Sequence, residues 1–281
     1  MRTRIFFAIL LYRLIDAEPP RVIPSHLENR FTMSGRIPLT SFYVDDSGGN
    51  GTFYKYSNET IESYINSAAT MKRKYLRITS IKSPSDDRSL LQTPKKYWIF
   101  EALQKYPLPA HSAVAVLGSM EPWYEAVALV SGAKTTTTIE YNRLLYDHPN
   151  MSTMQVRDMS YDDMTNKFDA ALSISSFDHD GLGRYGDPID PSADLKAMQN
   201  VWRILRPNGL LYLAVPIGPD LVVWNLHRRY GPLRLPMLLK SGYWEVIGRI
   251  AWNEQKLHAK MDHRKRYEPI IVLRKIRSDE L

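Results

Sequence analysis

The sequence contains no cysteine among its 281 residues. Disulfide bonds, thiolate nucleophiles and cysteine-zinc sites are therefore excluded, and an oxidising compartment would find no thiol to mispair. Long apolar runs are also missing, because the run over residues 5–12 is far too short to cross a bilayer as a helix. The G-x-G-x-x-G turn of dinucleotide-binding folds does not follow the first strand-like segment at residues 112–117, which disfavours a nicotinamide-linked oxidoreductase.

Charge and composition set broad limits on the protein class. The net charge is +7, with 44% apolar and 11% aromatic residues, which predicts a globular chain with one sizeable core. This mild basic excess suits an anionic ligand or surface, or simply solvation. No RNA- or DNA-binding motif accompanies it, so nucleic acid is not an expected partner.

Both ends of the chain resemble targeting signals of the secretory pathway. Arg2 and Arg4 precede the short apolar run, an order typical of a signal peptide, which we assign to residues 1–17; a short amphipathic helix is the alternative. The last four residues, 278–281, read SDEL and resemble an endoplasmic reticulum retrieval signal. We therefore expect residence in the lumen, no stable membrane span, and the retrieval receptor as a partner. Three sequons, compatible with a glycoprotein, lie at Asn50, Asn58 and Asn150.

The rest of the chain divides into an extension and a domain. Residues 18–92 predict a loop-rich N-terminal extension with one helix, over residues 59–78. A further helix should open at Thr93 and Pro94 and stop at Pro107. From there to residue 277, strand-like runs alternate with helical stretches, which predicts a doubly wound, mostly parallel sheet of the Rossmann-like type. Two late strand-like runs predict an edge hairpin, the usual finish of class I methyltransferases, and so a seven-stranded sheet.

Residues that could bind a ligand lie at the ends of the first three predicted strands. In doubly wound sheets ligands bind beyond the carboxyl ends of the strands. Gly118 and Ser119 end the first strand, and glycine permits close backbone approach. Glu140 ends the second, where a carboxylate can accept both ribose hydroxyls of a nucleoside, and Asp158 ends the third. Each acid alone is more often a helix cap or a solvated end, but their shared position at successive strand ends favours a ligand site.

A polar loop over residues 175–191 follows the fourth strand. His179 is the candidate general base, because imidazole can remove a hydroxyl proton near neutral pH, with Asp178 and Tyr185 beside it as further catalytic candidates. Arg184 and Asp187 are candidates for binding the acceptor. The alternative is a turn-rich structural loop in which Asp178 and His179 hold backbone amides.

A second polar cluster follows the fifth strand, with Asn225, His227 and Arg228 as candidate acceptor ligands. Arginine recognises carboxylates and phosphates through paired hydrogen bonds. The alternative is a loop whose arginines pair with Asp187 or Asp190.

Several segments together resemble a known family. The segment RILRPNGLLYLAVPIG resembles the fifth-strand region of class I methyltransferases. The segments GSMEPWYEA, GAKTTTTIEYN, SSFDHDGLGRYGDPIDP and NLHRRY resemble domain of unknown function 268, a family first catalogued in Caenorhabditis, over residues 93–275. The resemblance implies a cofactor cleft at Gly118, Ser119, Glu140 and Asp158, with GLGRYGDP as the family's own hallmark. Asp178 departs from the glutamate common in relatives, as do Ser192 and Ala193 from an acidic-glycine pair.

Two functions remain open from the sequence. The first is an S-adenosylmethionine-dependent methyltransferase that methylates an oxygen of a lumenal acceptor, such as a glycan or another small molecule. The second is a catalytically inactive, methyltransferase-like lumenal binding protein. No metal site is expected, because the seven histidines show no ligand spacing.

Overall fold

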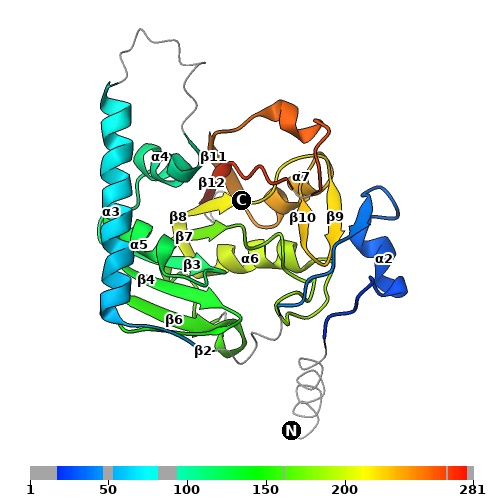
Figure 1. The fold of residues 1–281 in the computed structure, drawn as a ribbon, viewed down its shortest axis with the longest axis horizontal. Helices are drawn as coiled ribbons and strands as arrows, with labels where there is room; N and C mark the ends of the chain where they lie inside the picture. Colours follow the sequence, from blue (N-terminus) through cyan, green and yellow to red (C-terminus); the bar gives the residue numbers. More distant parts are fainter. Residues whose placement is uncertain (1–17, 47–52, 82–93, 161, 264, 277–281) are drawn as a thin grey trace, which may run out of the picture.

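A computed structural model describes residues 18–46, 53–81, 94–160, 162–263 and 265–276. It arranges them in three layers, with a central sheet covered by helices on both faces (Figure 1). The expected signal peptide at residues 1–17, Asn50 and the terminal tetrapeptide lie outside the described residues.

The central sheet has seven strands in the order β11-β12-β8-β7-β3-β4-β6. They are β3 (Ser112–Leu117), β4 (Ala133–Glu140), β6 (Met151–Gln155), β7 (Phe168–Ile174), β8 (Leu205–Ala214), β11 (Trp244–Ile250) and β12 (Ile270–Lys275). The strands from β6 to β8 run parallel to one another, whereas β12 is antiparallel to both β8 and β11. The predicted doubly wound sheet with its late edge hairpin is confirmed, and it is the class I methyltransferase arrangement.

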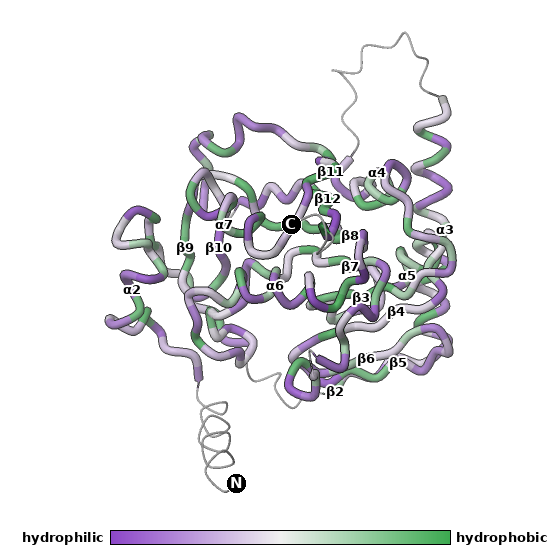
Figure 2. Tube along the Cα trace, turned by 180° about the vertical axis from the view of Figure 1, so that it is seen from behind, coloured by the Kyte–Doolittle hydropathy of each residue, from purple (hydrophilic) through white to green (hydrophobic). Residues whose placement is uncertain are grey.

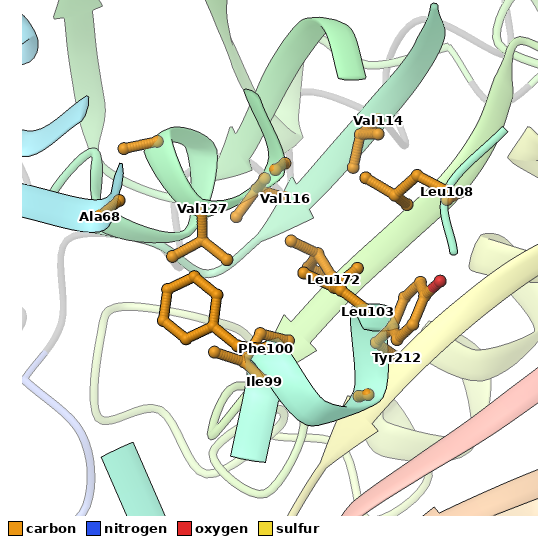
Figure 3. Close-up of a cluster of buried hydrophobic side chains, with 14 of the residues drawn as sticks. Ala68, Ile99, Phe100, Leu103, Leu108, Val114, Val116, Val127, Leu172 and Tyr212 are labelled. Atoms are coloured by element: carbon orange, nitrogen blue, oxygen red, sulfur yellow. The ribbon is translucent and has the colours of Figure 1, made fainter. Parts of the chain in front are cut away.

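Helices cover the two faces of this sheet because its central strands are apolar on both sides. On one face lie α3 (Asn58–Ile81), α4 (Trp98–Lys105) and α5 (Trp123–Val130); on the other lie α6 (Ala193–Ile204) and α7 (Arg234–Lys240). Val116 of β3 packs in the first cluster and its neighbour Leu117 in the second. In Figure 3, Ala68, Phe100 and Val127 from the three helices converge on Val116 and Leu172.

The two predicted N-terminal helices are confirmed. In α3 the buried side chains Ile61, Ala68 and Tyr75 recur every seventh residue, so one face of the helix meets the core. Figure 2 shows hydrophilic stretches alternating with hydrophobic ones along the same helix. The second helix begins as a 3-10 turn, η2 (Lys95–Tyr97), and continues as α4; Thr93 lies outside the described residues.

Residues 18–46, which the sequence predicted as loop, form a strap with structure of its own. It contains α2 (Ser25–Phe31) and β1 (Leu39–Ser41). Strand β1 pairs in parallel with β9 (Leu221–Trp224), which pairs antiparallel with β10 (His227–Arg229). Most apolar contacts of this strap lie in one cluster, which holds Ile23, Phe31, Ile37, Leu182, Val222 and Trp224, while Val44 packs against a smaller cluster of Leu221, Val223 and Leu226. The strap therefore completes a small second sheet inserted after β8.

A third, two-stranded sheet joins the extension to the edge of the domain. In it β2 (Phe53–Tyr56) pairs in parallel with β5 (Arg143–Tyr146). The hydroxyl of Tyr56 donates a hydrogen bond to the carbonyl of Met120 (2.9 Å), just beyond β3. Among the described residues, none of the helices combines the length and apolar character needed to span a membrane.

Candidate active site

A cavity of about 300 Å³ lies beyond the carboxyl ends of β3, β4 and β7. Its floor includes Gly118 after β3 and Glu140 at the end of β4, and one wall is the loop after β7. Strands β6 and β7 are joined by the short η3 (Val156–Asp158) and turns. Val156 lines the cavity, as do residues of α6 such as Ala197 and Val201.

Gly118 makes the turn that opens this cavity. Its φ is +69°, and a Cβ there would lie 2.2 Å from Oγ of Ser176, so only glycine fits. Ser119 is buried and does not line the cavity. Its hydroxyl donates to the carbonyl of Glu121 (2.7 Å) and lies 3.2 Å from Oε2 of Glu125. Ser119 thus stabilises the turn through these two contacts.

Glu125 is a residue that the sequence reasoning missed. It lies on α5, is fully buried, and accepts a 2.5 Å hydrogen bond from the hydroxyl of Thr138 on β4. Burial raises the pKa of Glu125 to about 7, against the opposing effect of its hydrogen bonds to Thr138 and Ser119. A single acid in the apolar helix PWYEAVALV was the available signal. Glu125 joins the Gly118 turn to the strand that ends in Glu140.

Glu140 points its carboxylate into a nearly dry environment. Its side chain is 6% exposed and lines the cavity. Oε1 accepts hydrogen bonds from the backbone amide (3.2 Å) and the side-chain amide (3.1 Å) of Asn142. Burial raises the pKa of Glu140, and these hydrogen bonds oppose the rise. The predicted position at a strand end is confirmed, and its role as a cofactor ligand stays a prediction.

Asp158 is placed differently. Strand β6 ends at Gln155, three residues earlier than expected, and Asp158 closes the 3-10 turn with its side chain exposed. The neighbours Val156 and Met159 line the cavity instead. The structure therefore brings Glu140 and Gly118 together, but leaves Asp158 outside the wall.

His179 lines the cavity, yet both ring nitrogens face protein atoms. Nδ1 lies 2.6 Å from the carbonyl oxygen of Leu226, to which it donates, and Nε2 lies 3.3 Å from Oδ2 of Asp178. The ring also meets Tyr185 edge to face, with centroids 5.6 Å apart. Asp178 is fully buried, and burial raises its pKa while His179 lowers it. The histidine is thus held through Nδ1, whereas Nε2 contacts the Asp178 carboxylate without forming a hydrogen bond to it.

The loop after His179 is held by its own backbone. Asp187 accepts hydrogen bonds from the amides of Gly181 (2.6 Å), Gly183 (3.2 Å) and Tyr185 (3.3 Å). Arg184 forms a 2.7 Å ion pair with Asp46 of the strap. Asp187 and Tyr185 line the cavity, but the carboxylate of Asp187 is engaged by backbone amides of the loop.

Strand β10 brings the second predicted cluster next to this loop. Arg228 is buried and donates to the carbonyl of Asp180 (2.5 Å), with Nε 3.9 Å from the carboxylate of Asp194. Oδ1 of Asn225 accepts from the amide of Val44 in the strap (2.9 Å). His227 is fully buried, and burial lowers its pKa to about 3, with Arg266 contributing. Arg228 thus links β10 to the loop that holds Asp180 and to Asp194 of α6. The low pKa of His227 keeps its imidazole neutral.

Acidic groups outnumber basic ones on the cavity wall. Glu140, Asp180, Asp187 and Asp190 line it, with Lys196 as the cation among the described lining residues. Lys196 pairs with Asp190 at 2.6 Å. Burial and the nearby Asp187 raise the pKa of Asp180 well above its usual value. The wall favours a ligand that is neutral or positively charged at its centre.

Known structures similar to this chain include three methyltransferases. One is the 1,6-didemethyltoxoflavin-N1-methyltransferase of Burkholderia thailandensis, with 1,6-didemethyltoxoflavin and S-adenosylhomocysteine bound (14% identity, TM-score 0.46, covering 75% of this chain and 90% of that one). The others are S-adenosylmethionine-dependent methyltransferases of Mesorhizobium loti (12%, 0.43, covering 63% and 98%) and Methanosarcina mazei (12%, 0.43, covering 66% and 99%).

No curated protein matches the chain. A family model matches residues 111–276, which are more than half of the chain and include the whole central sheet. The chain therefore belongs to the family described as Caenorhabditis protein of unknown function, DUF268.

Proposed function

We propose that the protein binds S-adenosylmethionine in the cavity beyond β3, β4 and β7 and transfers its methyl group to an oxygen of an acceptor. One observation carries the proposal: the Gly118 turn, which admits no side chain because a Cβ would collide with Ser176, lines the cavity beside the buried carboxylate of Glu140 on the next strand. In doubly wound sheets this is where nucleoside ligands bind.

The residues present fit the cofactor. Glu140 can accept the two ribose hydroxyls, while Ile139, Val156 and Met159 give apolar surface for a flat base. The acidic side chains that line the cavity suit the positively charged sulfonium group of S-adenosylmethionine. When bound, S-adenosylmethionine supplies an electrophilic methyl group, whose transfer needs mainly an acceptor held in line. The chain's own contribution is then to hold and orient both molecules, and few indispensable catalytic side chains are expected.

A second candidate, a lumenal binding protein without catalysis, is favoured by a different observation. The predicted catalytic and acceptor-binding groups His179, Arg184 and Arg228 all engage protein atoms. The Gly118 turn is also followed by no further glycine before α5.

Calorimetry with S-adenosylhomocysteine and S-adenosylmethionine tests the proposal directly. We expect the purified protein to bind both. Incubation with labelled S-adenosylmethionine and a lumenal extract then tests transfer, with glycans as the proposed acceptors. Absence of binding would contradict the cofactor assignment, whereas binding without any labelled product would favour the non-catalytic candidate.

A further inference from the structure

Two N-glycosylation sequons lie within the described residues. They are N-E-T at Asn58 and N-M-S at Asn150. Both asparagines are exposed, as are Thr60 and Ser152, whose hydroxyl groups complete the sequons. An asparagine-linked glycan is bulky and belongs on the surface, and both positions meet this requirement in the folded chain.

The side-chain amides of the two asparagines are also free. In the part of the chain that the structure describes, neither amide has a hydrogen-bond partner. By contrast, Asn142 is buried and its amide donates to Oε1 of Glu140 (3.1 Å). A glycan on Asn58 or Asn150 would therefore break no side-chain hydrogen bond, whereas one on Asn142 would.

Contacts between the two segments place the sequons at one corner of the molecule. The amide of Asp147 donates to the carbonyl of Tyr56 (3.0 Å), so the chain just before Asn58 lies beside the chain just before Asn150. Nε2 of His148 lies 3.4 Å from Oε1 of Glu62 on α3. The start of α3 is therefore adjacent to the turn that precedes β6.

This corner lies at the opposite edge of the central sheet from the cavity. Strand β6 begins at Met151, directly after Asn150, and Val156, directly after the last residue of β6, lines the cavity. A five-residue strand spans about 16 Å. Neither Asn58 nor Asn150 lines the cavity, so a glycan at this corner leaves the candidate active site open.

We propose that Asn58 and Asn150 both carry N-linked glycans, which project from the corner of the sheet opposite the cavity. In the modification, the amide nitrogen of each asparagine bonds to the anomeric carbon of an oligosaccharide and loses one proton. The bond from that carbon to the diphosphate of a lipid-linked donor breaks, and the lipid diphosphate leaves. The assignment needs lumenal residence, but it does not depend on cofactor binding or on methyl transfer.

Expression of the full chain in cultured animal cells tests the two sites. Peptide-N-glycosidase F should increase the gel mobility of the parent protein, and Asn58→Gln and Asn150→Gln should each reduce this shift by one glycan. Asn66→Gln is the matched control, because Asn66 is an exposed asparagine of α3 outside any sequon; its shift should equal that of the parent. A parent protein that the enzyme leaves unchanged, or a full shift in either sequon variant, would overturn the proposal.

Substitutions at Ser152 separate loss of the sequon from loss of the asparagine. Ser152→Ala should lack the same glycan as Asn150→Gln, whereas Ser152→Thr keeps the hydroxyl group and should keep the glycan. A glycan retained at Asn150 in Ser152→Ala would contradict N-glycosylation as the modification.

A copy in which residues 1–17 are replaced by the signal peptide of a secreted protein distinguishes two ways in which the proposal can fail. Glycans on this copy but not on the parent would show that the parent does not enter the lumen. Glycans on neither would show that the two asparagines are not used. Either result overturns the proposal, the first through localisation and the second through the sites themselves.

Discussion

At the scale of single residues, the carboxylate of Glu140 is only 6% exposed beside the cavity and has therefore lost most of its hydrating water. Glu140 keeps Asn142 as a partner on one oxygen, and burial raises its pKa. A ligand that donates hydroxyl hydrogens would replace the missing water, so contacts to Glu140 should be strong.

Glu140→Ala should weaken binding of S-adenosylhomocysteine by about 1 to 3 kcal/mol, the usual loss for a hydrogen bond to a charged group. Calorimetry measures this. Asp158→Ala is the matched control: its side chain is exposed and outside the cavity wall, so we expect little change. Equal losses in both variants would contradict the assignment of the cavity as the cofactor site and restore Asp158 as a ligand.

His179 should behave as a structural residue. Its ring holds the Leu226 carbonyl with Nδ1, so His179→Ala leaves that buried acceptor without a donor and should lower the free energy of unfolding by about 1 to 3 kcal/mol. Chemical denaturation measures the change. If stability is kept while methyl transfer falls about a hundredfold, His179 is the general base that the sequence predicted.

At the scale of elements, Glu125 connects the turn after β3 to β4 through Ser119 and Thr138. Its pKa is about 7 in the folded protein and near 4.5 when unfolded. The folded state thus binds the proton more tightly, so the stabilisation is complete below pH 4.5 and declines as the pH rises to 7.

Relative to Glu125→Gln, the free energy of unfolding of the parent protein should therefore fall by about 3 kcal/mol between pH 4 and pH 8. Denaturant titrations of both proteins across this range measure the difference, which cancels the other titrating groups. A difference that is independent of pH would show that Glu125 titrates normally.

The elements also show what a sequence can predict. Central strands such as β3 and β7 are apolar runs that bury both faces, so local composition identifies them and the sheet follows. The strap was missed because β1 has three residues and pairs with β9, about 180 residues away, and such distant pairing leaves no local period. For the site, strand ends located Gly118 and Glu140. Whether Asp187 or Arg228 met a ligand or a backbone carbonyl depended on loop geometry, which residue types alone do not encode.

At the scale of the whole molecule, lumenal residence is still a proposal from residues 1–17 and 278–281. A copy tagged internally, in the segment 82–93, should stay in the endoplasmic reticulum of expressing cells. Removing residues 279–281 should release it to the medium, as expected for loss of a retrieval signal. Immunofluorescence and blotting of medium decide this, and cytosolic staining of the intact chain would contradict it.

The loop after His179 bears on how relatives of this protein are recognised. Gly181 and Gly183 have φ near +75°, and a Cβ at Gly181 would lie 2.0 Å from the carbonyl oxygen of Asp190. The Asp187 carboxylate then closes the loop through backbone amides. The GLGRYGD motif thus specifies the backbone conformation of this loop. A genome survey that collects proteins by this motif would gather chains that share a folded loop, so the proposed cofactor binding should be judged by Glu140 instead.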